Sequence, residues 1–434
     1  MKHAAIAYAL LVIVIGLLVT AVMTRETDTE KQEAKAEQEA EAKEPKTPPA
    51  EIAPAEEIAN RVAAIRDTEF DNASPKVLVV PPEELTKKLT ELDAEPPQDK
   101  NLVAAGAILL AQAGALPPDQ AEQLVNRRYG GTGTLAAYLP KENAILVDEE
   151  LAESDPEIAE AAAAGEMSRA LDSVGPQAPR VPPLFHDDEA ARVTIFGGVA
   201  GFVEREYAAE HLEGEVDAEA ARDSRLDPET PPALETLSHF PTTVGTAFVR
   251  GAHKAGGWDA VDELLGETPT TTQELLKANA AEAVPAPRFA VKSELGKPWK
   301  RLASADVGRL DTVALLRAGL SERNAVKLSD GYRSARFETW IKGKPQQGCA
   351  PPCAKKSVTV VVHRWGDAAD ADTFNKAMRD SLISGDAGAT PDGGRGFEIG
   401  TGGGALVRAG RFTALVFAPD AQTAGAIAQK ALEA

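Results

Sequence analysis

Residues 155–171, DPEIAEAAAAGEMSRAL, decide the fold of the surrounding chain. Alanine has the highest helix propensity, so this alanine-rich run predicts a stable helix. On its N-terminal side, residues 132–147 predict a β-hairpin, in which TLAAYL and AILV pair across a PKEN turn. On its C-terminal side, residues 190–212 predict a second long helix. A hairpin followed by two long helices is therefore the expected centre of this part of the chain.

Periodicity and turn residues extend this pattern in both directions. Residues 58–323 are expected to form one mainly helical domain, with a strand at 76–80 and further helices at 82–92, 101–115, 118–128, 244–254, 259–265 and from 271 onward. Residues 324–434 change in character and predict a small α+β domain, with strands at 332–341, 357–363, 405–408 and 411–417 and helices at 367–382 and 420–432. The predicted fold class is α+β.

The N-terminal segment predicts the compartment. Residues 4–23 carry no charge, and at about 1.5 Å rise per residue such a helix spans roughly 30 Å, the thickness of a bilayer core. We expect residues 1–24 to be a transmembrane anchor and the charged, proline-containing residues 25–57 to be a stalk. Lys2 favours the cytoplasmic side for the N-terminus, which makes this a single-pass membrane protein with extracytoplasmic domains. A cleaved signal peptide ending near Ala21 is the alternative, and it too implies export.

Composition excludes some partners and favours one covalent link. The chain has 67 acidic and 46 basic residues, a formal charge of −21, and only 5% aromatic residues. Such a chain repels nucleic acid and offers few rings for base stacking. Its two cysteines, Cys349 and Cys353, flank an Ala-Pro-Pro turn, and in an exported protein they are expected to form a local disulfide. Two unpaired loop thiols are the alternative.

Several segments resemble, in their order along the chain, the exported bacterial zincin-type metallopeptidases of the HExxH kind. GEMSRAL at 165–171 lies where that family has HExxHAL, and TIFGGVA at 194–200 lies where it has the helix with the third metal ligand. TAFVRGAHKAGGWDAVDELLGETPTTTQELL at 246–276 is similar to the family's FV…GGW..V…PP.ST.Q.L segment. GYRSARF at 331–337 resembles its GW.GDR motif but departs at Ser334 and Ala335. The resemblance covers residues 57–434 and implies a zincin-like fold.

The zinc ligands of that family are missing at the matching positions. A zincin binds its metal through two histidines four residues apart and a carboxylate from a second helix, while a glutamate activates the bound water. Here Gly165 and Arg169 stand at the histidine positions, and the third-ligand segment offers Gly197 and Val199. Only the general-base position, Glu166, is retained. The resemblance therefore implies a member without metal or other cofactor.

Two interpretations of the neighbouring charges remain open. Arg169 either forms an exposed ion pair with Glu166 or places its guanidinium where the metal would lie and neutralises that carboxylate. Glu204, Tyr207 and His211 share one helical face, which is either a solvated polar face or a ligand cluster.

The resemblance leads to one expected function and two rivals. We expect a membrane-anchored, extracytoplasmic pseudo-metallopeptidase that is non-catalytic and binds a protein, a peptide or an envelope component. The first rival is a hydrolase acting through a non-zinc site around Glu166, and the second is a plain scaffold whose resemblance is accidental. Packing of residues 165–169 against residues 197–199 is expected only if the resemblance reflects a shared fold.

Overall fold

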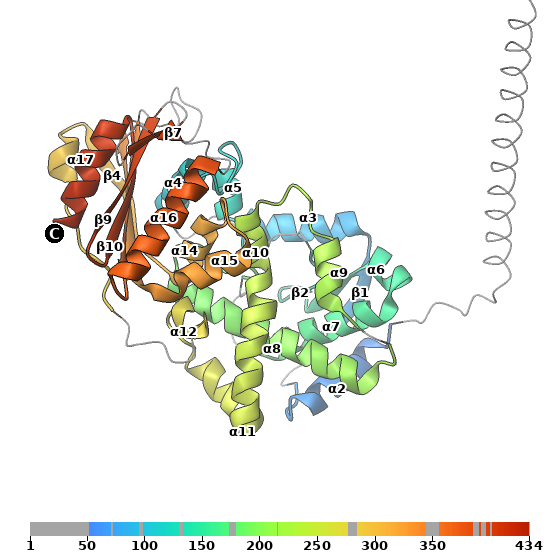
Figure 1. Cartoon of the computed structure of the whole chain (residues 1–434). Helices are drawn as coiled ribbons and strands as arrows, with labels where there is room; N and C mark the ends of the chain where they lie inside the picture. The colour runs from blue at the N-terminus through green and yellow to red at the C-terminus, as the bar shows by residue number, and fades with distance from the viewer. Residues whose placement is uncertain are drawn as a thin grey trace, which may run out of the picture. The chain divides into compact units, whose positions relative to one another are not determined.

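The computed structural model describes residues 52–70, 73–94, 99–129, 133–172, 179–214, 216–276, 284–343, 356–384, 390–391, 396–399 and 402–433. Contacts group residues 52–434 into one compact unit (Figure 1), separate from residues 1–51. The expected anchor, almost all of the expected stalk, and both Cys349 and Cys353 lie outside the described residues. Within the described ranges, no helix combines the length and apolar character needed to cross a membrane.

The first part of the compact unit consists of helices around a three-stranded sheet. The strands, in the spatial order β1-β3-β2, are β1 (Lys76–Val80), β3 (Ala144–Asp148) and β2 (Ala136–Leu139). β2 and β3 are antiparallel, which confirms the predicted hairpin, and β1 runs parallel to β3. The helices of this part are α2 (Ala55–Ile65), α3 (Pro82–Asp93), α4 (Lys100–Gln112), α5 (Ala121–Val125), α6 (Glu149–Ser154), α7 (Pro156–Leu171), α8 (Asp187–His211), α9 (Ala218–Ser224), α10 (Pro232–Phe240), α11 (Thr246–Gly266) and α12 (Thr272–Leu276). The next helix, α13 (Lys292–Leu295), contributes Leu295 to a core of the second part.

The alternation of side chains along β3 separates two cores. Ile145 and Val147 point toward the core shared with α2, α7 and α8, whereas Leu146 points toward the core under α3. Because successive strand residues face opposite sides of a sheet, one short apolar strand can serve both layers. Tyr207 of α8 is completely buried in the first of these cores. The sheet thus fixes α7 and α8 on one of its faces.

The second part carries a seven-stranded sheet in the order β4-β5-β6-β10-β9-β8-β7. Its strands are β4 (Trp299–Val307), β5 (Tyr332–Lys342), β6 (Ser357–Trp365), β7 (Thr390–Pro391), β8 (Gly396–Ile399), β9 (Gly402–Ala409) and β10 (Phe412–Ala418). α16 (Ala368–Ser384) and α17 (Ala421–Leu432) contribute to the cores on opposite faces of this sheet (Figure 1). The remaining short helices are α14 (Arg309–Leu316), α15 (Glu322–Leu328) and η2 (Ser329–Gly331). Helices and strands occur together in this unit, so the α+β class is confirmed.

The two parts share a core across the boundary expected at residue 324. β4 precedes that boundary yet pairs with β5 along its length. Leu109 and Leu110 of α4 belong to the same buried cluster as Phe337 of β5 and Phe374 of α16. The folded unit also begins at Ile52, before the expected start at residue 58.

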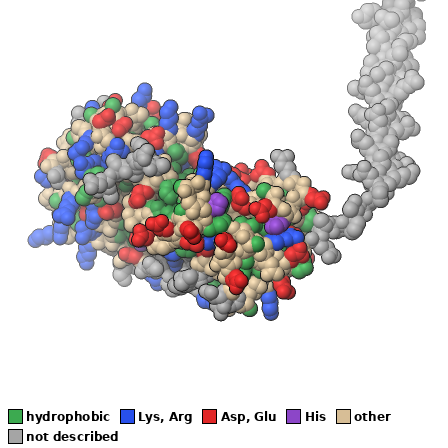
Figure 2. All heavy atoms as spheres, turned by 90° about the horizontal axis from the view of Figure 1, so that it is seen from below, with side chains coloured by type: hydrophobic (Ala, Val, Ile, Leu, Met, Phe, Trp, Pro, Cys, Tyr) green, Lys and Arg blue, Asp and Glu red, His purple; other side chains and the backbone are tan. Residues whose placement is uncertain are grey.

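Lys and Arg side chains gather over the end of the unit that holds the large sheet (Figure 2).

Candidate functional site

The candidate site lies where α7 crosses α8. The side chain of Asp155 accepts a hydrogen bond from Ile158 N at 3.1 Å and so caps the start of α7. Further along α7, a Cβ added at Gly165 would lie 3.1 Å from the carbonyl oxygen of Ala200 and 3.2 Å from Glu204 Oε2. The absence of a side chain at Gly165 therefore allows the close crossing. The predicted packing of the Glu166 helix against the Gly198 helix is confirmed.

The glycines Gly197 and Gly198 of α8 make room for a segment other than α7. A Cβ added at Gly198 would fall within 3.0 Å of backbone atoms of Gly245, and one at Gly197 would collide with Pro241. Both of these neighbours belong to η1 (Pro241–Gly245), a π-helical segment between α10 and α11. Proline in a helix interior removes a backbone donor and disturbs the i→i−4 pattern, which accounts for a wider turn at this point. Gly197 and Gly198 thus admit η1 rather than α7.

Val199, the other expected ligand position on α8, points away from the site. Its side chain is completely buried in the apolar core formed with α2 and α7. A carboxylate at that position would therefore have entered the core instead of a metal site.

Glu166 is engaged by several donors at the centre of the site. Arg180 Nη1 donates to its Oε1 at 3.0 Å, and Arg180 Nη2 also contacts Oε2. Tyr138 N donates to Oε2 at 3.0 Å, and Arg169 Nε lies 3.3 Å from Oε1. Burial raises the pKa of Glu166, but the charges of Arg180 and Arg169 and the backbone donor at Tyr138 more than offset it and hold this pKa below its ordinary value. Glu166 is consequently an ionised carboxylate whose charge is balanced by the neighbouring arginines.

Arg169 lies deep in the site, so the alternative of an exposed ion pair does not apply. Its side chain is 15% exposed, and its Nη2 would lie 3.2 Å from a Cβ added at Gly197. Burial lowers the pKa of Arg169; the charge of Glu166 opposes this, while the like charges of Arg180 and Arg222 add to it. Arg169 is thus a cation in a crowded positive environment.

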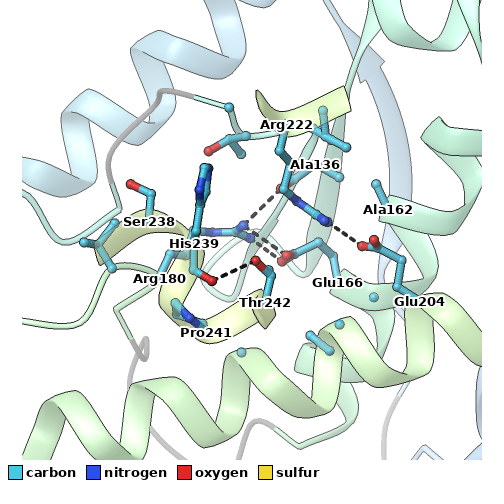
Figure 3. A pocket seen from close by; sticks show the side chains of 18 of the residues that line it. Ala136, Ala162, Glu166, Arg180, Glu204, Arg222, Ser238, His239, Pro241 and Thr242 are labelled. Carbon is cyan, nitrogen blue, oxygen red and sulfur yellow. Dashed lines mark hydrogen bonds and ion pairs between the residues drawn. The ribbon is translucent and has the colours of Figure 1, made fainter. Parts of the chain in front are cut away.

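A second ion pair closes the site on the side of α9. Arg222 Nη2 donates to Glu204 Oε2 at 2.5 Å (Figure 3). Glu204 is 6% exposed and lies beside Gly165, so α8 does bring a carboxylate to the site, seven residues beyond Gly197. Burial lowers the pKa of Arg222, but the charge of Glu204 and its hydrogen bond outweigh this effect, so the pKa is raised overall. The carboxylate of Glu204 is therefore already paired with Arg222.

These groups line a pocket of about 80 Å³. Seven small residues line it, namely Gly133, Ala136, Ala162, Gly165, Gly197, Ala200 and Gly201, together with the larger Tyr129, Leu135, Val181, Leu226 and Pro241. Its polar lining comprises Thr134, Glu166, Arg169, Arg180, Glu204, Arg222, Ser238, His239 and Thr242. Thr242 Oγ1 donates to the carbonyl oxygen of His239 at 3.1 Å, which links η1 to the end of α10 (Figure 3). The volume is several times the ~10–15 Å³ that one water needs.

Of the two interpretations of the face with Glu204, Tyr207 and His211, a solvated face does not hold for the first two residues. Tyr207 is completely buried and donates to Glu160 Oε1 at 2.6 Å, whereas Glu204 faces the pocket. His211, with a 27% exposed side chain, packs edge-on against the Tyr207 ring at a centroid distance of 5.1 Å. α8 lies between two layers, so its polar stripe faces α7 and α9 rather than solvent.

In the described part of the chain, no three His, Cys, Asp or Glu side chains are grouped so that they could hold a metal.

Sequence reasoning missed Arg180, Arg222 and His239. Arg180 follows residues 173–178 and precedes a Val-Pro-Pro run, so no helical periodicity connects it to α7. Arg222 belongs to the short helix α9, and His239 to the last turn of α10. Only the three-dimensional fold brings them to the pocket.

No protein-family model, curated protein or solved structure matches this chain.

Proposed function

We propose that this protein is a membrane-anchored, extracytoplasmic pseudopeptidase: a zincin-like domain without zinc that binds a protein, a peptide or an envelope component. The observation that supports it best is the engagement of Glu166 by Arg180, Tyr138 N and Arg169. Two arginines lie beside the retained general-base position, and Arg169 itself stands at an expected ligand position. The anchor and the export rest on the N-terminal sequence.

The same contacts disfavour hydrolysis through Glu166. A general base must have an oxygen lone pair directed at the attacking water and a pKa suited to taking its proton. Both oxygens of Glu166 already accept hydrogen bonds, and its pKa lies below the ordinary value. The arginines stabilise the charged form further, so proton uptake from water is opposed. We therefore propose binding in place of catalysis.

The metal content of the full chain, purified without chelator, tests this proposal. We expect no stoichiometric zinc by elemental analysis and no peptidase activity that a chelator abolishes, because the two imidazole positions carry Gly165 and Arg169. Glu166→Gln provides the matched variant for the rival hydrolase, since any hydrolysis that depends on this carboxylate would disappear with it. About one tightly bound zinc per chain, or hydrolysis that Glu166→Gln abolishes, would overturn the proposal.

A further inference from the structure

β1 is an edge strand with exposed apolar side chains. Among the described residues it pairs with β3 alone, so its other edge is free. Leu78 is 44% exposed and Val79 47%, and they are two of the three large apolar side chains that are exposed in the described part of the chain. A free apolar edge is a template for pairing with another strand. The kind of strand that fits depends on the backbone groups that point outward.

Alternate residues of β1 direct their backbone toward β3. Lys76 N donates to the carbonyl oxygen of Asn143 at 3.1 Å, directly before β3 begins. Because backbone groups alternate in direction along a strand, Leu78 also turns its N–H and C=O toward β3. Val77 and Val79 turn theirs toward the free edge, where each offers one donor and one acceptor.

Two prolines frame this free edge. Pro75 and Pro81 occupy the next positions of the same alternation, and neither has an N–H to donate. Each lies three residues from Leu78, just as Val77 and Val79 each lie one residue from it. The pattern of donors along the free edge is therefore the same when it is followed in either direction, with Leu78 at its centre.

We infer that β1 pairs antiparallel with β1 of a second copy of this chain, with Leu78 on the two-fold axis. In this register, Val77 of one copy lies opposite the partner's Val79, and antiparallel residues placed in this way exchange both of their backbone hydrogen bonds. Cross-strand pairs of apolar side chains add to the stability of such a ladder. The contact closes on itself, because a two-fold interface uses the same edge in both copies. It joins the three-stranded sheets of the two copies into one.

The charges at the two ends of β1 favour a second copy in the antiparallel direction. Lys76 is exposed at the start of β1, whereas Glu83 and Glu84 are exposed in the first turn of α3, just beyond its end. Antiparallel pairing brings Lys76 of each copy toward the end of β1 that leads into the partner's acidic turn. Parallel pairing places like charges together, which is unfavourable. The inference goes beyond the proposed function and does not rest on it.

Cysteine cross-linking of the full chain in detergent micelles tests the register. In a background with Cys349→Ser and Cys353→Ser, Leu78→Cys places two thiols at a pair whose Cα atoms lie about 4.5 Å apart, within the ~4.4–6.8 Å that a disulfide spans. Lys76→Cys is the matched control, since it is also exposed, but the two copies of residue 76 lie about 13 Å apart along the strands. We expect mild oxidation to give a covalent dimer with Leu78→Cys and little with Lys76→Cys.

Sedimentation velocity of the full chain in the same micelles measures the association itself. Val79→Pro removes an N–H from the free edge without touching the ladder between β1 and β3, and it is expected to weaken the dimer about tenfold or more. Val79→Thr keeps both the N–H and a β-branched side chain and is expected to keep the dimer. Far-UV circular dichroism and thermal unfolding of both variants show whether the fold of each copy is retained.

Three results overturn the inference. The first is a natural chain that stays monomeric, which would leave the free edge to a strand of another protein. The second is a cross-link with Lys76→Cys as extensive as that with Leu78→Cys. The third is a dimer that Val79→Pro leaves unchanged, as is expected if the N-terminal segment alone holds two copies together. Zinc content and hydrolysis play no part in these readouts, so the dimer and the pseudopeptidase proposal stand or fall separately.

Discussion

Replacing Arg180 by methionine removes the main partner of Glu166 while keeping a long, flexible side chain in the loop. Arg180 Nη1 donates to Glu166 Oε1 and to the carbonyl oxygen of Ala136, each at 3.0 Å. Removing one partner of a buried ion pair costs about 3–5 kcal/mol, because the other charge stays buried. Arg169 remains at 3.3 Å from Glu166, so we expect the lower end, a loss of about 3 kcal/mol in the free energy of unfolding near neutral pH.

The pH dependence of this loss identifies its cause. In the natural protein the pKa of Glu166 is lowered on folding, so its stabilising contribution is present above the unfolded-state pKa of about 4.3 and is lost as pH falls through the folded-state pKa. In Arg180→Met, burial is no longer offset to the same degree, and the pKa of Glu166 rises. Protonation then relieves the buried charge at low pH. The difference in stability between the two proteins should therefore shrink from about pH 7 to about pH 4.

Urea unfolding followed by tryptophan fluorescence at these two pH values measures the effect. The double variant Arg180→Met, Glu166→Gln should recover part of the loss at neutral pH, because the uncompensated charge is gone. Arg205→Met, at an exposed ion pair of α8, is the matched control and should change stability by less than about 1 kcal/mol. A loss that is the same at both pH values, or no larger than that of the control, would refute the assignment of Arg180 as the group that neutralises Glu166.

Three further predictions follow from other parts of the chain. Gly198→Ala forces its new Cβ against the backbone of η1 and should lower the free energy of unfolding by about 1–3 kcal/mol, whereas Gly251→Ala, which meets nothing within 4 Å in α11, should be neutral or stabilising in thermal unfolding. His363 is fully buried, which lowers its pKa to about 3, so stability should fall by up to about 1.4 kcal/mol per pH unit as pH drops below about 6.5; a His363→Phe variant lacks this group, and an unchanged slope would count against the argument. Thiol labelling of native protein isolated without reductant should find neither Cys349 nor Cys353 reactive, and stoichiometric labelling would remove the predicted disulfide.

Much of the fold could be predicted because its signals are local. Secondary structure is predicted by a few neighbouring residues in the alanine run of α7, in the strands of the hairpin and in the apolar β6. The two helices predicted on either side of Gly256 correspond to α11, which contains non-helical backbone angles at Gly256 and Gly257. β4 was missed because its burial is irregular along its length, and its pairing with β5 includes a register shift near Arg301. Local patterns of this kind carry no information about distant partners.

For the candidate site, the sequence predicted which metal-binding side chains are absent but not which charged groups are present. The resemblance to the zincin-type peptidases predicted that residues 165 and 169, one helical turn apart on the same face, would carry no imidazole. It could not place Arg180 and Arg222, which lie on a loop and on α9 and reach α7 and α8 only through the tertiary fold. Glu204 was misjudged for the same reason, since a helical face tells nothing about the layer that covers it.

The geometry of Gly165 depends on the ion pair between Glu204 and Arg222. A Cβ at this position would meet the carbonyl oxygen of Ala200 at 3.1 Å and Glu204 Oε2 at 3.2 Å, so these neighbours would have to give way. A histidine placed there adds a ring beyond this Cβ, displaces the carboxylate of Glu204 and so breaks its 2.5 Å bond to Arg222. The buried Arg222 would then lack its partner, at a cost of about 3–5 kcal/mol. Histidines placed at positions 165 and 169 should consequently destabilise the crossing of α7 and α8 before any metal binds, because this site is built around paired charges.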